Sequence, residues 1–150
     1  MTAPAGQAIK PSELEKLTSF AEARPYIDAV FLYGSVARGE AASGSDLDLG
    51  VLLTHEANEN GTDILRLISD LMDVFGREDI DVAILNNASP LLLHRVARDG
   101  HVLYATSNRV VAEFHIRAIQ QYEDTRPLRK MRTERLDRLL KRSALKQVDS

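Results

Sequence analysis

The stretch from Ala29 to Leu49 constrains this chain most, because it joins two apolar runs through a short segment that contains glycine and serine. The first run, residues 29–33, ends at Gly34 and Ser35. Glycine lacks a Cβ, so a backbone turn at this point can approach another group closely. The helix expected next would direct unpaired amides at a bound phosphate. The stretch therefore predicts a buried strand, a phosphate-binding turn and a returning strand.

Two carboxylates open the second apolar run. Asp46 and Asp48 are two residues apart, so in a strand their side chains project from the same face. Carboxylates placed in this way repel each other unless a cation lies between them. Mg²⁺ binds carboxylate oxygens together with substrate phosphates. A phosphate-binding turn next to a metal-binding pair of acids predicts nucleotidyl transfer.

A third acid is expected on a neighbouring strand. Asp81 begins the apolar run of residues 81–85, and a carboxylate there that faced Asp46 and Asp48 would complete a two-metal site. Paired ions in such a site hold the attacking and leaving oxygens of an in-line displacement. Asp79 is the competing candidate, because residues two apart share one face of a strand. Asp81 is favoured, since it lies within the apolar run and Asp79 lies before it.

Length and composition fit one domain. The chain has 150 residues, of which 44% are hydrophobic and 27% charged, enough to form a core. It contains no cysteine, which excludes disulfides and thiolate metal sites. No apolar stretch approaches the roughly 20 residues that a membrane-spanning helix needs, and the first ten residues lack the apolar segment of a signal peptide. These features predict a soluble, cytoplasmic protein with no membrane partner.

Hydrophobic periodicity predicts a small α/β sheet with helices packed on it. The apolar positions of the long helix that starts at residue 108 are expected to face inward: Val111, Phe114, Ala118, Ile119 and Tyr122. Tyr33 and Tyr104 are also expected in the core, and the four histidines are expected to be ordinary surface or helix residues. Further helices are expected over residues 13–23, 35–40, 62–75, 90–98 and 128–146, with Ser12 and Ser89 as N-caps. Strands are expected over residues 27–33, 46–53, 80–85 and 101–104. Loops are expected over residues 41–45 and 54–61.

The net charge of −3 conceals an uneven distribution. Between Arg126 and Lys146 the chain has nine basic residues and two acidic ones, so the remainder carries a charge of −10. Such a segment indicates either a contact with an acidic partner, nucleic acid included, or a solvated basic helix at the chain end.

The motif around the first turn resembles a known signature. The string Gly-Ser-x-Ala-Arg-Gly, then five residues, then Ser-Asp-x-Asp-Leu, is similar to that of the nucleotidyltransferase superfamily typified by DNA polymerase β, and in particular to its minimal nucleotidyltransferase (MNT) domains. Residues 81–92, 99–104, 113–114 and 122–127 narrow the resemblance to the MNT antitoxins that are paired with HEPN toxins. The similarity covers roughly residues 12–130.

The resemblance implies a nucleotidyltransferase-like small mixed sheet with C-terminal helices, and a division of the chain into three parts. These are a flexible N-terminus (1–11), a transferase core (12–107) and a helical segment with a basic tail in the same domain (108–150). It also implies an enzyme that uses ATP and two Mg²⁺ ions.

The resemblance further implies roles for the motif residues. Asp46, Asp48 and Asp81 would bind the metal ions, and Asp81 would help to deprotonate the attacking hydroxyl. Gly34 and Ser35 would hold the β- and γ-phosphates.

Two further motif residues are expected at the nucleotide. Ser45 belongs to the nucleotide-binding motif, and Arg38 either neutralises phosphate charge or anchors the loop to Glu40 or Asp46.

The partner implied by the resemblance is a HEPN ribonuclease, which the MNT antitoxin silences by transferring AMP to one of its tyrosines. A hetero-oligomer is expected, with the helices after residue 108 and the basic tail in the contact, and direct nucleic-acid binding is not expected. Two alternatives stay open: a transferase for a small molecule such as an aminoglycoside, and an antitoxin that acts by binding alone. Only about 45 residues follow the fourth expected strand, which counts against a separate acceptor domain.

Overall fold

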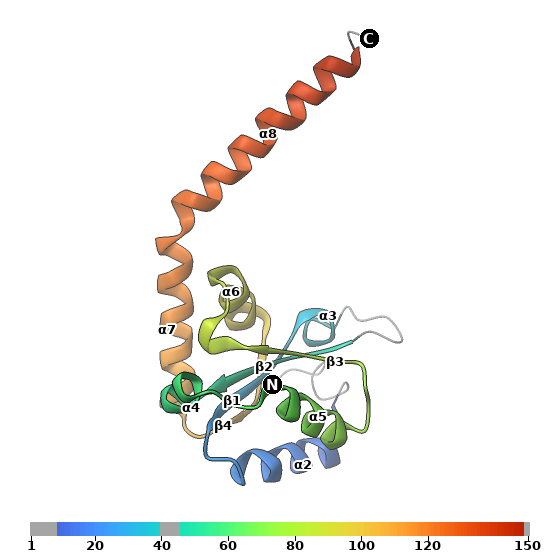
Figure 1. Ribbon diagram of the computed structural model, residues 1–150, viewed down its shortest axis with the longest axis vertical. Coiled ribbons are helices and arrows are strands. Elements are labelled where there is room, and N and C mark those ends of the chain that lie inside the picture. Colours follow the sequence, from blue (N-terminus) through green and yellow to red (C-terminus); the bar gives the residue numbers. More distant parts are fainter. Residues whose placement is uncertain (1–8, 40–45, 149–150) are drawn as a thin grey trace.

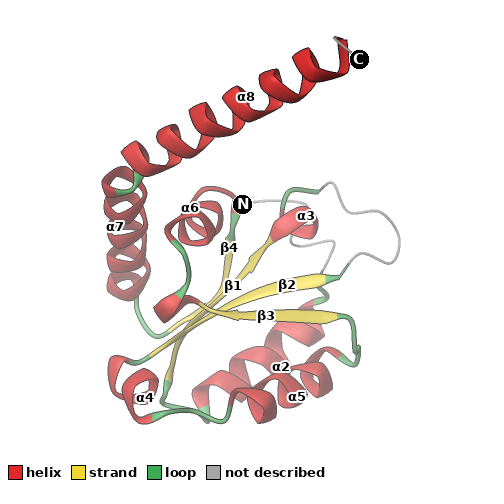
Figure 2. Cartoon of the chain, turned by 45° about the horizontal axis from the view of Figure 1, so that its top comes forward, coloured by secondary structure: helices red, strands yellow, loops and turns green. Residues whose placement is uncertain are grey.

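A four-stranded sheet forms the centre of the molecule, and helices cover both of its faces (Figures 1 and 2). The computed structural model describes residues 9–39 and 46–148. The strands, in chain order, are β1 (Ile27–Tyr33), β2 (Leu47–Leu53), β3 (Ile80–Ile84) and β4 (His101–Ala105). The strand order is β3-β2-β1-β4, in which β1 pairs antiparallel with β2 and β4 while β2 and β3 are parallel. The sheet is therefore mixed, which confirms the expected fold class.

One face of the sheet is covered by α2 (Pro11–Glu22) and α5 (Ile64–Phe75), which lie side by side in Figure 2. Asp63 caps α5 by accepting a hydrogen bond from the Arg66 amide, and Gly76 ends it in the left-handed conformation, with φ of 62°. The core on this face includes six residues that are at most 1% exposed: Leu17, Leu32, Leu49, Val51, Leu67 and Leu71.

The opposite face is covered by α6 (Pro90–Asp99) and α7 (Asn108–Asp124). Ser89 caps α6 as predicted, since its side chain accepts from the Leu92 amide at 3.2 Å. The rings of Phe31 and Phe114 pack with their centroids 4.8 Å apart. These contacts confirm Phe114 as a core residue and fix α6 and α7 over the sheet.

Two local predictions were wrong. Residues 54–61 do not form a loop, because Thr54 caps the short helix α4 (His55–Asn60) by accepting from the Ala57 amide at 3.2 Å. This helix has no buried residue, so hydrophobic periodicity could not reveal it. The first helix begins at Pro11 and not after Ser12, with Lys10 as N-cap and its amide bonded to the Glu13 carboxylate at 2.9 Å.

Fewer of the apolar side chains of α7 are buried than the sequence predicts. Phe114 and Ala118 are buried, but the Ile119 side chain is 58% exposed, because only one edge of the helix faces the sheet. The expected loop 41–45 lies outside the described residues. The short helix expected over 35–40 is observed as α3 (Gly34–Ala37).

The C-terminal helix α8 (Arg126–Val148) projects away from the rest of the molecule (Figure 1). Side chains from residue 130 to 146 are all exposed, including the leucines. In the described part of the chain, no helix combines the length and the apolar character that crossing a bilayer requires.

Candidate functional site

Three polar residues form a row across the ends of three strands. Backbone pairing places Tyr33 of β1 opposite Asp48 of β2, and Asp48 next to Asp81 of parallel β3. Residues paired in register project from the same face of a sheet. The register therefore brings together two of the three predicted carboxylates, which are far apart in sequence.

This row borders a hollow of about 640 Å³. The hollow contains five of the seven predicted site residues. Asp46 precedes β2, is exposed and does not line it, and Ser45 lies outside the described residues. The lining consists of Tyr33, Gly34, Ser35, Arg38, Asp48, Asp81, Arg95 and Arg98.

Gly34 is required at the start of α3 for two reasons. Its φ is +76°, a conformation that residues with a side chain rarely adopt. A Cβ at this position would also collide with the Oδ2 atom of Asp48. The glycine therefore allows the turn after β1 to lie directly against the carboxylate of β2.

The carboxylates that border the hollow affect the pKa of their neighbours. Burial raises the pKa of Asp48, and the neighbouring charges of Asp81 and Asp46 raise it further, while Arg38 opposes them. Burial together with Asp48 and Asp81 raises the pKa of Tyr33 to about 12. A carboxylate whose ionisation is disfavoured by neighbouring carboxylates matches part of the donor set of a hard divalent cation.

The three predicted carboxylates are not gathered into a finished metal site. Among residues 9–39 and 46–148, no three acidic, histidine or cysteine side chains converge closely enough to hold an ion. The adjacent pair Asp48 and Asp81 is the part of the predicted set that the fold places together.

Asp79, the competing third acid, is engaged elsewhere. Its carboxylate accepts two hydrogen bonds from the Arg77 guanidinium, each of 2.6 Å, which lower its pKa. Its carbonyl accepts from the Leu47 amide at 2.9 Å. Asp79 thus stabilises the chain just before β3, while Asp81 faces the hollow.

Sequence reasoning missed Arg95 and Arg98, which α6 contributes to the lining. Their spacing of three residues on one helix was the available signal. The prediction for the histidines was wrong for His101, because its Nε2 lies 2.9 Å from the Ala37 carbonyl oxygen and links β4 to the end of α3. Tyr33, expected in the core, is half-buried and also borders the hollow.

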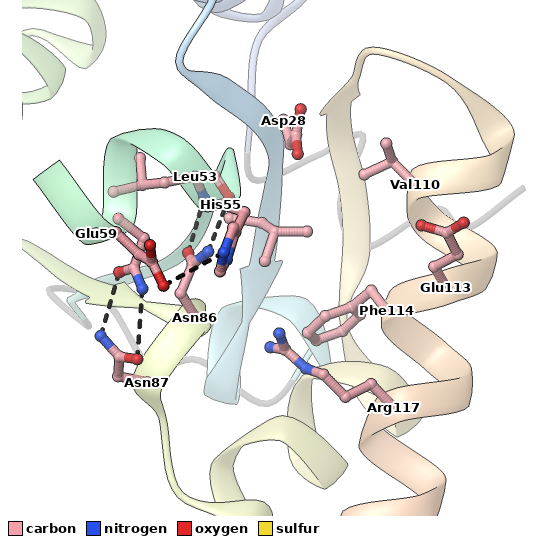
Figure 3. A pocket seen from close by; sticks show the side chains of 12 residues that line it. Asp28, Leu53, His55, Glu59, Asn86, Asn87, Val110, Glu113, Phe114 and Arg117 are labelled. Atoms are coloured by element: carbon pink, nitrogen blue, oxygen red, sulfur yellow. Dashed lines mark hydrogen bonds and ion pairs between the residues drawn. The ribbon is translucent and has the colours of Figure 1, made fainter.

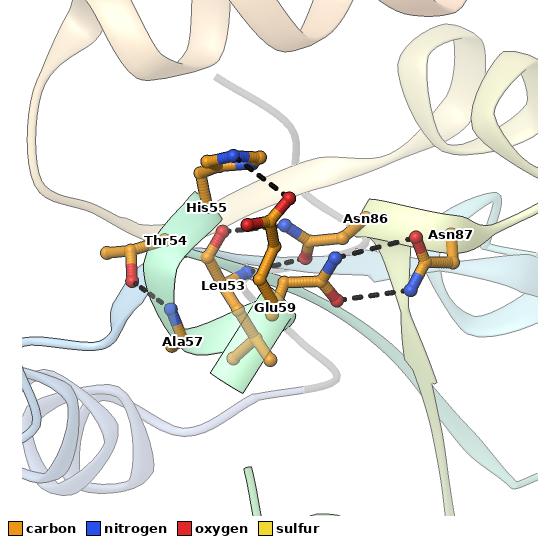
Figure 4. Close-up of polar contacts among 8 residues, drawn as sticks. Leu53, Thr54, His55, Ala57, Glu59, Asn86 and Asn87 are labelled. Carbon is orange, nitrogen blue, oxygen red and sulfur yellow. Dashed lines mark hydrogen bonds and ion pairs between the residues drawn. The ribbon is translucent and has the colours of Figure 1, made fainter. Parts of the chain in front are cut away.

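A second hollow of about 490 Å³ lies at the other end of the strands (Figure 3). Much of its polar lining is bonded internally: the Asn86 side chain pairs with both backbone groups of Leu53 at 2.8 Å, and His55 contacts Glu59 at 3.3 Å (Figure 4). Arg117 donates to the Leu85 carbonyl oxygen at 2.9 Å. These groups stabilise the chain after β2 and β3, and the glycine turn and the carboxylate pair are at the opposite end.

Comparison with known proteins identifies the family. The family profile described as "Polymerase beta, Nucleotidyltransferase" matches residues 15–109. The chain belongs to this nucleotidyltransferase family. Consistently, it is 30% identical over 125 residues to the protein adenylyltransferase MntA of Aphanizomenon flos-aquae (strain 2012/KM1/D3), a match that covers 79% of this chain and 83% of MntA.

Solved structures share the nucleotidyltransferase fold. A toxin–antitoxin structure with AMP-PNP matches with a TM-score of 0.69 and 21% identity, over 82% of this chain and 97% of that one. The MNT antitoxin in complex with a tri-AMPylated Shewanella oneidensis HEPN toxin matches with a TM-score of 0.64 and 20% identity, over 83% and 95%. At such identities these matches establish the fold.

Asp48→Asn is expected to stabilise the metal-free protein at pH 7. A raised carboxylate pKa means that the ionised side chain destabilises the folded state above that pKa, and this penalty disappears as the pH falls below the unfolded value. We expect Tm to rise by about 1–3 °C, after allowance for solvent screening of a partly exposed group. Thermal unfolding in EDTA at pH 7 measures the change.

The matched control is Asp79→Asn. The pKa of Asp79 is lowered by Arg77, so its stabilising effect is present above the unfolded pKa and is lost as the pH falls. This variant should therefore gain no stability at pH 7. A fall in Tm for Asp48→Asn, or an equal rise for both variants, would contradict the assignment of repulsion to Asp48.

Proposed function

We propose that this nucleotidyltransferase is an Mg²⁺-dependent antitoxin that transfers AMP from ATP to a tyrosine hydroxyl of a partner HEPN ribonuclease toxin and thereby neutralises it. The observation that carries the proposal is the hollow in which the Gly34 turn meets Asp48 and Asp81. Support comes from the relative MntA, named a protein adenylyltransferase, and from the fold neighbours with AMP-PNP or a tri-AMPylated HEPN toxin.

The carboxylate row would hold the metal. Asp48 and Asp81 would bind two Mg²⁺ ions, with Asp46 as a further ligand from the segment before β2. The bound ions would neutralise the charge that develops on the phosphate oxygens. The Asp81 carboxylate, the more exposed of the pair, would accept the proton of the attacking hydroxyl.

The turn after β1 would bind the nucleotide. Backbone amides of Gly34 and Ser35 and the Ser35 hydroxyl would hold the β- and γ-phosphates, and Ser45 would contribute from the same motif. Arg38 also lines the hollow, where its charge would help to neutralise a phosphate. Attack of the tyrosine oxygen on the α-phosphorus would then form the AMP ester and release pyrophosphate.

The acceptor would come from the partner. On this proposal residues 12–107 form the transferase core, and residues 108–150 form a C-terminal segment of the same domain. Within that segment α7 packs on the sheet and α8 projects outward, and neither lines the hollow. An acceptor carried on another protein fits this arrangement better than a small molecule, which would need a binding surface of its own.

The helix α8 would contribute to the toxin contact. Beside its basic residues it carries six apolar side chains that are at least 51% exposed: Leu128, Met131, Leu136, Leu139, Leu140 and Leu145. Exposed apolar groups on a projecting helix indicate a protein contact, and the interspersed positive charges favour an acidic partner surface.

The direct test uses ATP labelled at the α- or the γ-phosphate, with Mg²⁺ and the partner toxin. We expect protein-bound label from the α position only. Asp48→Asn and Asp81→Asn should lower transfer by about 100-fold or more, because even outer-shell partners of metal ligands cost about 10- to 100-fold when they are removed. Asp79→Asn, directly before the strand that carries Asp81, is the matched control and should keep most of the activity.

Other labelling patterns would contradict the proposal. Label from the γ position would indicate a kinase. Transfer to an aminoglycoside without any protein acceptor would indicate the small-molecule enzyme. An antitoxin that acts by binding would give two results together. Its stable complex with the toxin would acquire no label from ATP, and the Asp48→Asn, Asp81→Asn double variant would still neutralise the toxin in cells.

Deletion of residues 127–150 is expected to weaken the complex with the toxin. Because the side chains of residues 130–146 are exposed, the shortened protein should unfold within a few degrees of the full chain. Co-elution on a sizing column measures the complex, and replacing Leu136, Leu139 and Leu140 by serine separates the apolar contribution from charge. Undiminished co-elution of the shortened protein would remove α8 from the contact.

A further inference from the structure

The proposed transfer assigns no role to two arginines on α6, although both line the hollow that contains Asp48 and Asp81. Leu93 and Val96 are each 1% exposed and anchor this helix in the core against the sheet. This anchoring fixes the helix from which Arg95 and Arg98 reach the rim of the hollow, together with Gly34 of the phosphate turn. Their position is therefore set by a rigid element.

The charges around the hollow are divided by element. The strands β2 and β3 contribute Asp48 and Asp81, whereas α6 contributes Arg95 and Arg98 and the turn after α3 contributes Arg38. An ATP triphosphate carries several negative charges, and the carboxylates alone would repel it. The cations supply the complementary potential, and a guanidinium can hold a phosphate through two parallel hydrogen bonds.

The two arginines differ in how they are held. Arg98 is oriented by Asp99, to which its Nε donates at 3.1 Å and its Nη2 at 2.8 Å, yet its side chain remains 60% exposed. The pKa of Asp99 is lowered first by Arg98 and also by Arg38, which indicates that both cations lie near this one carboxylate. Within the described part of the chain, Arg95 forms no hydrogen bond and no ion pair, so its guanidinium is available to a ligand.

We propose that Arg95 and Arg98 bind the terminal phosphates of the nucleotide, and so the pyrophosphate that leaves during transfer, with Asp99 as a positioning residue for Arg98. This inference rests on the proposed function and extends it, because it assigns the leaving-group side of the site to α6. The α-phosphate would then lie toward Asp48 and Asp81, where the hydroxyl attacks.

The test measures nucleotide binding to the purified protein by isothermal titration calorimetry, in the presence of Mg²⁺ and without the partner toxin. Three probes separate the phosphates: α,β-methylene ATP, which cannot transfer AMP, together with AMP and inorganic pyrophosphate. Arg95→Ala and Arg98→Ala should each lower the affinity for the ATP analogue and for pyrophosphate by about 10-fold or more. This is the scale of a lost hydrogen bond to a charged group. AMP affinity should stay within about twofold.

The matched control is Arg109→Ala, which removes an exposed arginine of α7 that pairs with Glu113 at 2.8 Å outside the hollow. It should change none of the three affinities. Because Arg98→Ala also leaves Asp99 unpaired, Arg95→Ala is the decisive variant, and circular dichroism checks that it is folded. Unchanged affinity of Arg95→Ala for the ATP analogue, or a parallel loss for AMP, would overturn the inference.

The outcome can be separated from that of the proposed function. The wild type could transfer no AMP to the toxin while Arg95→Ala still lowers the affinity for the ATP analogue and pyrophosphate but not for AMP. In that case the proposed function fails and the phosphate site stands. If transfer occurs and Arg95→Ala binds all three probes normally, the function stands and this assignment fails.

Discussion

The pairing of β2 with β3 is the constraint on which the site depends, because it holds two carboxylates side by side that would otherwise move apart. Asp48 and Asp81 are in register in a parallel ladder. Their neighbours Leu47, Leu49 and Ile80 are buried in the core, so neither strand can shift without exposing apolar surface. The hydrophobic core therefore compensates for the electrostatic repulsion, and a divalent cation would remove it.

The remaining parts of the site are arranged around this pair. Gly34 lets the turn after β1 touch the Asp48 carboxylate, which a side chain at that position would prevent. His101 supports the end of α3 through the Ala37 carbonyl oxygen, and α6 brings arginines to the rim. Because these groups stand on strands or on anchored helices, the site is built from rigid elements, as transfer chemistry that works by positioning requires.

Local sequence patterns were sufficient for much of the fold. The bounds of β1 were predicted correctly, because an apolar run of this length is typical of a buried strand. Asp46, predicted to share a strand face with Asp48, instead precedes β2 and does not line the hollow. Tertiary packing was not readable from these patterns: the exposure of Ile119 and the contact between His101 and the Ala37 carbonyl oxygen both depend on how distant segments pack. Arg95 and Arg98 were missed for the same reason: their spacing shows that they share one side of a helix, but only the fold shows that this side faces the hollow.

The most direct measurement of the central claim is the position of the metal in crystals grown with Mn²⁺ and α,β-methylene ATP. We predict anomalous peaks in contact with both Asp48 and Asp81, next to phosphates held at Gly34 and Ser35. Mn²⁺ bound at another place, or a nucleotide bound away from this carboxylate pair, would contradict the account.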